Sequence, residues 1–331
     1  CLEHESPAQK CFQAKYRISY QFRYYFLMDF IRTSQFILTG MKNFIKRDKP
    51  FPHLEQNLKG AVVMVTGATA GLGLGIATDL ANRGATVHLV CRNKERGEAV
   101  RKDIVTKTKN ENIHLHLCDM SSMGDIRKLA ESFLRTEKSL NVLINNAGCM
   151  INKKEFTAEG LEKNFATNTL GTYYLTKLLV PLLKLSRPAK VITISSGGML
   201  TQPLVLKDIF MEKGFEGTSQ YAVNKRHQVA LTEWWSRCFT QQGVSFYSMH
   251  PGWVDTDGVK DSMPDFHKKF EKDLRPIDQG IDTVIWLTVT PDKDLKSGEF
   301  YFDRAIADKH LTVASTSYDD EKVDSLVGRL E

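Results

Sequence analysis

Short apolar runs alternate with longer stretches of mixed polarity along residues 61–302. The apolar runs are each five or six residues long and lie at 61–66, 86–90, 113–118, 141–145, 190–195, 244–249 and 298–302. They are mostly uncharged and rich in β-branched side chains, as expected of strands covered on both faces. The stretches between them predict helices near 71–82, 94–107, 122–136, 158–185, 219–241 and 276–289. This order predicts the α/β class, with a doubly wound parallel sheet of about seven strands.

The residues before this body follow a different pattern. From residue 22 onward, apolar side chains recur every three to four residues with basic residues between them, which predicts a basic amphipathic helix, or two short ones, over 22–46. The longest uncharged run there, 33–41, has nine residues. A spanning helix needs ~20 apolar residues, so this segment is not predicted to cross a bilayer. Either it lies in a membrane interface or it packs its aromatic face on the domain.

The predicted organisation has three parts. Residues 1–58 form an N-terminal extension, 59–303 an α/β domain and 304–331 a C-terminal tail. Because the chain begins with Cys1, Met28 is a candidate start, in which case residues 1–27 would not be native. The extension lacks the compact apolar core and small-residue cleavage site of a secretory signal.

Charge and cysteine usage narrow the function classes. The extension holds nine Lys/Arg and five Asp/Glu, so it carries +4 of the net +6 and leaves the other 273 residues at +2. A nucleic-acid binder would have a basic face on its folded body, so nucleic acid is excluded as a partner. The six cysteines form no C-x-x-C pair and the chain has no N-x-S/T sequon. These features favour an intracellular protein, cytoplasmic or on the cytoplasmic face of a membrane, over a secreted one.

A glycine-rich turn joins the first predicted strand to the first helix in the stretch VTGATAGLGLGIA. Its glycines Gly67, Gly71 and Gly73 allow a sharp turn and a close approach of the backbone to a pyrophosphate. The helix start then offers free N–H groups and a positive dipole end to the phosphates. In this context the turn predicts a Rossmann-type dinucleotide site. The alternative is a glycine-rich turn selected only for packing.

Three stretches place a tyrosine four residues ahead of a lysine: Tyr173 and Lys177, Tyr221 and Lys225, and Tyr318 and Lys322. At this spacing the lysine shares a helix face with the phenol and lowers its pKa, which suits proton transfer beside a hydride path. The first pair lies inside a long predicted helix and the last in an acidic tail. Only Tyr221 and Lys225 follow a strand ending in serines, at the carboxyl edge where open α/β sheets bind ligands. We therefore predict that this pair is catalytic.

These motifs, in this order, resemble the short-chain dehydrogenase/reductase family over residues 60 to about 303. The stretches that carry the resemblance are TGATAGLG (66–73), CDM (118–120), NNAG (145–148), FATN (165–168), ISSGG (194–198), YAVNK (221–225) and HPGWVDT (250–256). The CRN after the second strand, the NNAGCM stretch and the long gap before Tyr221 are similar to its retinol-dehydrogenase-like branch.

The resemblance implies a catalytic set of four residues. Tyr221 would act as general acid in reduction or base in oxidation, and Lys225 would lower its pKa. Ser196, rather than Ser195, would polarise the substrate carbonyl. Asn168 would hold a water that relays to Lys225. From the residues alone, Asn168 could equally be a helix-interior residue that makes local hydrogen bonds.

A nicotinamide cofactor is also implied. Its predicted contacts are Gly67, Thr69, Gly71, Leu72, Gly73, Arg92, Asp119, Met120, Asn146, Ala147, Gly148, Tyr221, Lys225, Pro251, Gly252, Val254 and Thr256. The second strand ends in Cys91 and Arg92, where a cofactor with a free ribose 2′-hydroxyl would favour an acidic residue. A guanidinium binds a 2′-phosphate bidentately, so NADP(H) is predicted over NAD(H). The alternative for Arg92 is a solvated loop charge.

The substrate and the partners are less constrained. Between Ser196 and Tyr221 lie the apolar residues Met199, Leu200, Leu204, Val205 and Phe215. They favour a small apolar or lipid-like substrate, a carbonyl compound or an alcohol, unless they merely cover the domain. No metal site is predicted, because His114 and His116 alternate on a strand without nearby ligands. Trp234-Trp235 is either core or a subunit contact, and the oligomeric state stays open. A second hypothesis is a non-catalytic NADP(H)-binding regulator or scaffold that acts through protein or membrane contacts.

Overall fold

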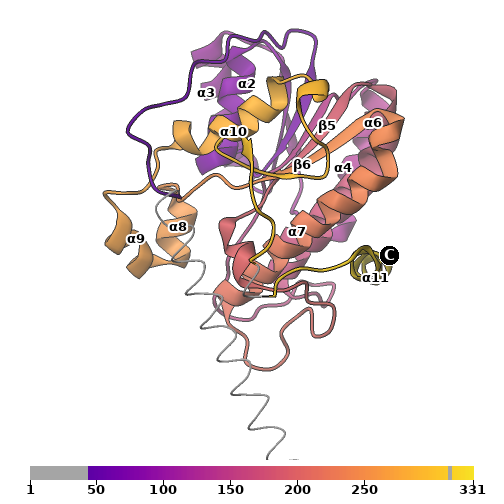
Figure 1. Ribbon diagram of the computed structural model, residues 1–331. Coiled ribbons are helices and arrows are strands. Elements are labelled where there is room, and N and C mark those ends of the chain that lie inside the picture. The colour runs from indigo at the N-terminus through magenta and orange to yellow at the C-terminus, as the bar shows by residue number, and fades with distance from the viewer. Residues whose placement is uncertain (1–43, 312–314) are drawn as a thin grey trace, which may run out of the picture.

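One twisted sheet runs through the middle of the protein, with helices packed on both of its faces (Figure 1). The computed structural model describes residues 44–311 and 315–331. The sheet order is β3-β2-β1-β4-β5-β6-β7-β8, parallel throughout except for the last pair. The strands are β1 (Val62–Thr66), β2 (Thr86–Cys91), β3 (Ile113–Leu117), β4 (Val142–Asn145), β5 (Ala189–Ile194), β6 (Val244–Met249), β7 (Phe300–Phe302) and β8 (Ala305–Ile306). The predicted fold class is confirmed.

The eighth strand was not predicted. It forms a two-residue hairpin with β7, and both turn residues have positive φ, +50° at Asp303 and +60° at Arg304. Such a turn matches the twist of the strands that it joins. Asn-Gly or Asp-Gly is its usual sequence signal, and Asp303-Arg304 does not carry it.

The helices form two layers, one on each face of the sheet. α2 (Gly71–Asn82), α3 (Lys94–Thr108) and α10 (Ile277–Val289) cover one face, and α4 (Met123–Thr136), α6 (Thr172–Leu185) and α7 (Gly217–Phe239) cover the other. The packing of β1 shows why its side chains are apolar at successive positions. Val63 and Val65 are fully buried in the first layer, whereas Met64, between them, is fully buried in the second.

Several helices begin where a polar side chain binds their first free N–H groups. Asn93 accepts a hydrogen bond from the backbone N–H of Arg96 at the start of α3, over 2.7 Å. Ser122 caps α4 and Glu216 caps α7 in the same way. The remaining helices in the described chain are α5 (Lys163–Phe165), α8 (Asp257–Ser262), α9 (Pro264–Phe270) and α11 (Asp320–Leu330).

The long helix predicted over 158–185 starts later and is interrupted. It begins at Lys163, where the carboxylate of Glu162 accepts the backbone N–H groups of Asn164 and Phe165. A π-helical turn, Ala166–Gly171, then separates α5 from α6. Sequence periodicity does not distinguish such a turn from the α-helix around it.

Both ends of the described chain pack on the α/β body. Leu54 and Leu58 contact the core layer of α2 and α10. α11, the yellow helix beside α7 in Figure 1, buries Val323, Leu326 and Val327 in the opposite layer. The predicted amphipathic helix over 22–46 lies outside the described residues, except for its last three. No helix among residues 44–311 and 315–331 is long and apolar enough to cross a membrane.

The carboxylate of Asp303 binds both Arg47, near the start of the described chain, and the buried Arg275. The carboxylate accepts hydrogen bonds from Arg275 Nη1 (2.6 Å) and Nη2 (2.9 Å), and from Arg47 Nη1 (2.5 Å). Arg275 is 1% exposed, and its Nε donates to the carbonyl oxygens of Phe44 (3.1 Å) and Ile45 (2.9 Å). The Asp303 carboxylate therefore compensates a guanidinium that water does not reach.

We predict that Asp303→Asn lowers the free energy of unfolding by about 3 kcal/mol, because it removes the charge that faces a buried guanidinium. Asparagine keeps the side-chain shape and tolerates positive φ. The matched control is Asp320→Asn, which breaks an exposed pair with Arg237 and should cost less than about 1 kcal/mol. Urea unfolding of both variants measures the difference, and equal losses would contradict the role given to Asp303.

Candidate functional site

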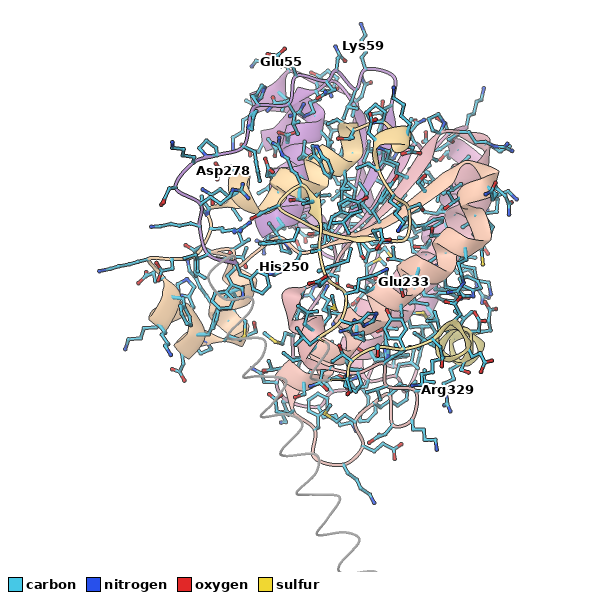
Figure 2. The ribbon with its side chains drawn as sticks, in the orientation of Figure 1. Glu55, Lys59, Glu233, His250, Asp278 and Arg329 are labelled. Carbon is cyan, nitrogen blue, oxygen red and sulfur yellow. The ribbon has the colours of Figure 1, made fainter. Side chains whose placement is uncertain are left out.

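The carboxyl ends of the parallel strands meet at one edge of the sheet and bring the predicted motifs together. Gly67 follows β1, Asn146 follows β4 and Ser196 comes two residues after β5. His250 directly follows β6 and is labelled near the middle of the molecule in Figure 2. Open α/β sheets bind their ligands at this edge.

The glycine turn is packed too tightly for side chains. Gly67 has φ +64°, and a Cβ on Gly73 would overlap the Gly67 carbonyl oxygen and lie 2.5 Å from Asn146 Nδ2. The turn is tied to the segment after β4, because Asn146 Nδ2 donates to the Thr66 carbonyl oxygen over 2.8 Å. The Thr66 hydroxyl accepts the backbone N–H of Ala147 at 2.9 Å. Close backbone approach is what a dinucleotide phosphate requires here.

α2 starts at Gly71 without a side-chain cap, because Ala70 precedes it. Its first N–H groups therefore stay available to an anion. Thr69 and Leu72 flank this start. The loop after β6 also reaches the glycine turn, because Thr256 Cγ2 in that loop would lie 3.3 Å from a Cβ on Gly71.

That loop contains the other predicted contacts after β6. Pro251 leads into Gly252, whose φ is +82° and against which Arg275 packs. Val254 is buried beside Gly280 of α10. Thr256 caps α8 by accepting the Val259 N–H over 3.3 Å.

A cavity of about 450 Å³ lies at the ends of β2 and β3. Arg92 and Asp119, both predicted cofactor contacts, line it together with Asn93, Leu117, Cys118, Asp125 and Lys128. Lys128 was not predicted, because it is one lysine on a charged helix face and belongs to no motif. Met120, by contrast, turns its side chain into the core.

Tyr221 and Lys225 lie one turn apart at the start of α7. Lys225 Nζ is 5.3 Å from the centre of the Tyr221 ring. Burial raises the pKa of Tyr221 to about 12, although a hydrogen bond with the Ser196 hydroxyl opposes the shift. Ser196 also accepts the Gly198 N–H over 3.1 Å. The structure thus brings Ser196, Tyr221 and Lys225 together.

Lys225 is 3% exposed, and this burial lowers its pKa to about 7. Its Nζ donates to the Ile194 carbonyl oxygen at 2.8 Å and to Gln228 Oε1 at 3.1 Å. Ser195, which is not the serine predicted to be catalytic, donates a hydrogen bond from its hydroxyl to the Lys225 carbonyl oxygen at 2.9 Å. Gly148 lies nearby, since a Cβ there would be 3.5 Å from Lys225 Nζ.

Asn168 lies in the π-helical turn and is fully buried. Its side chain accepts the Cys149 N–H at 2.9 Å and donates to the Cys149 carbonyl oxygen at 2.8 Å. Its own backbone carbonyl accepts a hydrogen bond from Gln228 Nε2 over 2.7 Å. Gln228 was not predicted either. The available signal was its position three residues after Lys225, which puts both on one helix face.

The other two tyrosine–lysine pairs serve packing. Tyr173 donates to the Glu331 carboxylate, with which Lys177 also forms an ion pair, so together they tie α6 to the end of α11. Tyr318 is half-buried, and the Arg226 guanidinium lies over its ring. Trp235 is buried in the same core as Tyr173, with Trp234 packed against it.

The structure also places the apolar residues after Ser196 and the histidine that follows β6. Met199 and Leu200 are buried in a small core cluster with Val229 and Phe300, so they cover the domain rather than line a cavity. His250 is neutral, because burial and then the nearby cations Arg275 and Lys225 lower its pKa to about 3. Residues 44–311 and 315–331 contain no cluster of His, Cys, Asp and Glu that could hold a metal ion.

Comparisons with known proteins agree with the α/β fold described above. A family model described as short chain dehydrogenase matches residues 61–266. Dehydrogenase/reductase SDR family member 12 of Bos taurus is 47% identical over 295 residues, which cover 88% of this chain and 90% of that protein. Retinol dehydrogenase 11 of Homo sapiens is 36% identical, over 76% of this chain and 79% of that protein. A putative short chain dehydrogenase from Escherichia coli CFT073, complexed with NADPH, has the same fold, with a TM-score of 0.63 and 22% identity over 75% of this chain and 98% of that one.

We predict that Gly73→Ala destabilises the protein by about 1–3 kcal/mol, because the new methyl group overlaps the Gly67 carbonyl oxygen. The control is Gly328→Ala in α11, where a Cβ would meet open space and alanine is the better helix former. It should leave stability unchanged or raise it. Thermal unfolding of the two variants compares them, and an unchanged Gly73→Ala protein would refute the tight packing of the turn.

Proposed function

The chain belongs to the short chain dehydrogenase family, and from this premise we propose that it is an NADP(H)-dependent oxidoreductase that interconverts an aldehyde or ketone and an alcohol. Membership of the family carries the coarser statement, an oxidoreductase that uses a nicotinamide cofactor. The observation that carries the finer one is the meeting of Ser196, Tyr221 and Lys225 at the carboxyl edge of the sheet.

The residues at the glycine turn fit such a cofactor. The backbone of Gly67 and Gly73 is too crowded for a Cβ, and α2 begins without a side-chain cap, so phosphates can approach N–H groups there. A bound nicotinamide would supply or accept a hydride. The chain itself would supply the proton chemistry and the orientation of the substrate.

Tyr221 is the proposed proton donor for carbonyl reduction. With its pKa raised to about 12 by burial, the phenol is protonated at neutral pH and can donate to the substrate oxygen. Ser196, which is hydrogen-bonded to Tyr221, would donate to the same oxygen as negative charge develops on it. When the Lys225 ammonium is present it lowers the pKa of the phenol, which is what the reverse, oxidising reaction needs.

The cavity at the ends of β2 and β3 supports a preference for NADP(H). Two cationic side chains, Arg92 and Lys128, line it, and a ribose 2′-phosphate is the dianionic group that distinguishes the two cofactors. Asp119 and Asp125 line the same cavity, so the two cations do not leave it strongly positive. The guanidinium of Arg92 is the better candidate for bidentate contact, and the Lys128 ammonium would add a point charge.

An apolar substrate is the proposal that rests most on the relatives. Two retinol dehydrogenases, 11 and 12 of Homo sapiens, are 36% and 34% identical to this chain, and their names refer to an apolar alcohol. Of the apolar residues between Ser196 and Tyr221, Phe215 is partly exposed, whereas Met199 and Leu200 are buried in the core. Contact of residues 22–46 with a membrane surface stays a prediction.

We predict that Tyr221→Phe lowers NADPH-dependent reduction of an aldehyde and ketone panel by at least about 100-fold, because the proton donor is lost. Tyr173→Phe is the matched control. It has the same spacing to a lysine, but its hydroxyl binds Glu331 and not the site. Cofactor oxidation followed by absorbance measures both. Full activity in purified Tyr221→Phe protein would show that the assignment is wrong.

We predict that Arg92→Ala raises the KM for NADPH by at least about tenfold, as expected for one lost charge-assisted hydrogen bond, and leaves the KM for NADH unchanged. Lys128→Ala should act in the same direction with a smaller effect. Arg96→Ala, an exposed arginine of α3 that is not among the residues lining the cavity, is the control. Equal changes for the two cofactors would remove Arg92 from 2′-phosphate recognition.

A further inference from the structure

One face of α7 carries Tyr221, Lys225 and Gln228, spaced by four and three residues. Gln228 is 1% exposed and makes two side-chain hydrogen bonds that both concern the site. Its Oε1 accepts from Lys225 Nζ over 3.1 Å, and its Nε2 donates to the Asn168 carbonyl oxygen over 2.7 Å. The amide therefore connects the lysine of the proposed catalytic pair to the π-helical turn.

The orientation of this amide is fixed by its neighbours. An ammonium has only donors and a backbone carbonyl has only acceptors. A flipped amide would place its NH₂ group against Lys225 Nζ and its oxygen against the Asn168 carbonyl oxygen, which breaks both hydrogen bonds. Burial prevents water from replacing them cheaply. Gln228 thus holds one conformation, with its oxygen on the lysine.

We propose that Gln228 is a positioning residue of this site, whose side-chain amide holds the Lys225 ammonium beside Tyr221 by linking it directly to the backbone of Asn168. The role given to Lys225 rests on the proposed function. Family resemblance implies a water between Asn168 and the lysine, and in this chain the Gln228 side chain itself contacts both residues.

The surroundings of Lys225 show why its hydrogen bond with Gln228 affects the stability of the ammonium. In the part of the chain that the structure describes, Nζ has two hydrogen-bond acceptors, the Ile194 carbonyl oxygen and Gln228 Oε1. The titratable groups that face it are Tyr221 from α7 itself, Cys149 after β4 and His250 after β6. None of these is a carboxylate, so neutral acceptors carry the stabilisation of the ammonium.

Substitutions of Gln228 should therefore move the pKa of Lys225 in opposite directions. Gln228→Met keeps the length of the side chain and removes the acceptor, which disfavours the ammonium and lowers the pKa of Lys225. Gln228→Glu keeps the acceptor and adds negative charge, which favours the ammonium and raises the pKa. Each shift should be at least about one pH unit, a tenfold change in the protonation equilibrium. A residue that only filled space would not give shifts of opposite sign.

The first test reads Lys225 directly in the full-length protein. Lysine labelled with ¹³C at Cε is titrated by NMR, and the Lys225 signal is assigned from its loss in Lys225→Arg. The matched control is Gln220→Met, because Gln220 is also fully buried on α7 but binds Glu162 and the Ile209 carbonyl oxygen. We expect a lower pKa in Gln228→Met, a higher one in Gln228→Glu and the wild-type value in Gln220→Met. An unchanged pKa in both Gln228 variants, with folding confirmed by circular dichroism, overturns the proposal.

The second test uses the pH dependence of kcat/KM for NADPH-dependent carbonyl reduction. The alkaline limb marks loss of the proton from the coupled pair, so it should move to lower pH in Gln228→Met and to higher pH in Gln228→Glu. Gln228→Met should also lose about tenfold in kcat/KM near neutral pH, the effect of one hydrogen bond to a charged group. Limbs that stay in place in both variants count against the proposal. A wild-type protein without turnover refutes the proposed function instead, and the NMR titration still decides the role of Gln228.

Discussion

Lys225 brings a positive charge into a place that water does not reach, and the surrounding structure has to satisfy it. Desolvation works against the ammonium and lowers its pKa to about 7. Its two acceptors come from different parts of the fold. One is the Ile194 carbonyl oxygen at the carboxyl end of β5, and the other is the side chain of Gln228, three residues after Lys225 on α7. Because the pKa lies near neutrality, small changes in either acceptor alter the charge that Tyr221 faces. Burial is thus what makes this lysine sensitive to its neighbours.

The π-helical turn connects this lysine to two other loops of the sheet edge. Asn168 uses its side chain to hold the backbone of Cys149 after β4, and its carbonyl to hold Gln228. At the end of the turn, a Cβ on Gly171 would overlap the Met120 carbonyl oxygen after β3. A regular α-helix directs its carbonyls to its own N–H groups, whereas a π turn changes that pairing and is frequent at functional sites. One short segment therefore contacts two loops of the sheet edge and helix α7.

The sequence was sufficient for features that depend on repeated patterns or on chain order. Strands covered on both faces are mostly apolar, which is why β1 could be recognised from its composition. Tyr221 could be separated from Tyr173 and Tyr318 because only its pair follows a strand that ends in serines. What could not be predicted depends on single contacts across the fold. The interruption at 166–171, the cavity face of Lys128 and the amide of Gln228 all require knowing which element packs against which.

The start of the described chain belongs physically to the same edge. The Phe44 carbonyl oxygen accepts the N–H of Trp253, in the loop that follows His250, over 2.7 Å. The Phe44 ring packs edge-on against His250 at 4.4 Å between centroids, and a Cβ on Gly197 would lie 2.8 Å from that ring. Composition separates the basic extension from the body, but hydrogen bonding and packing do not separate them at residue 44. Because Gly197 directly follows Ser196, any shift of this segment would reach the proposed catalytic serine through one peptide bond.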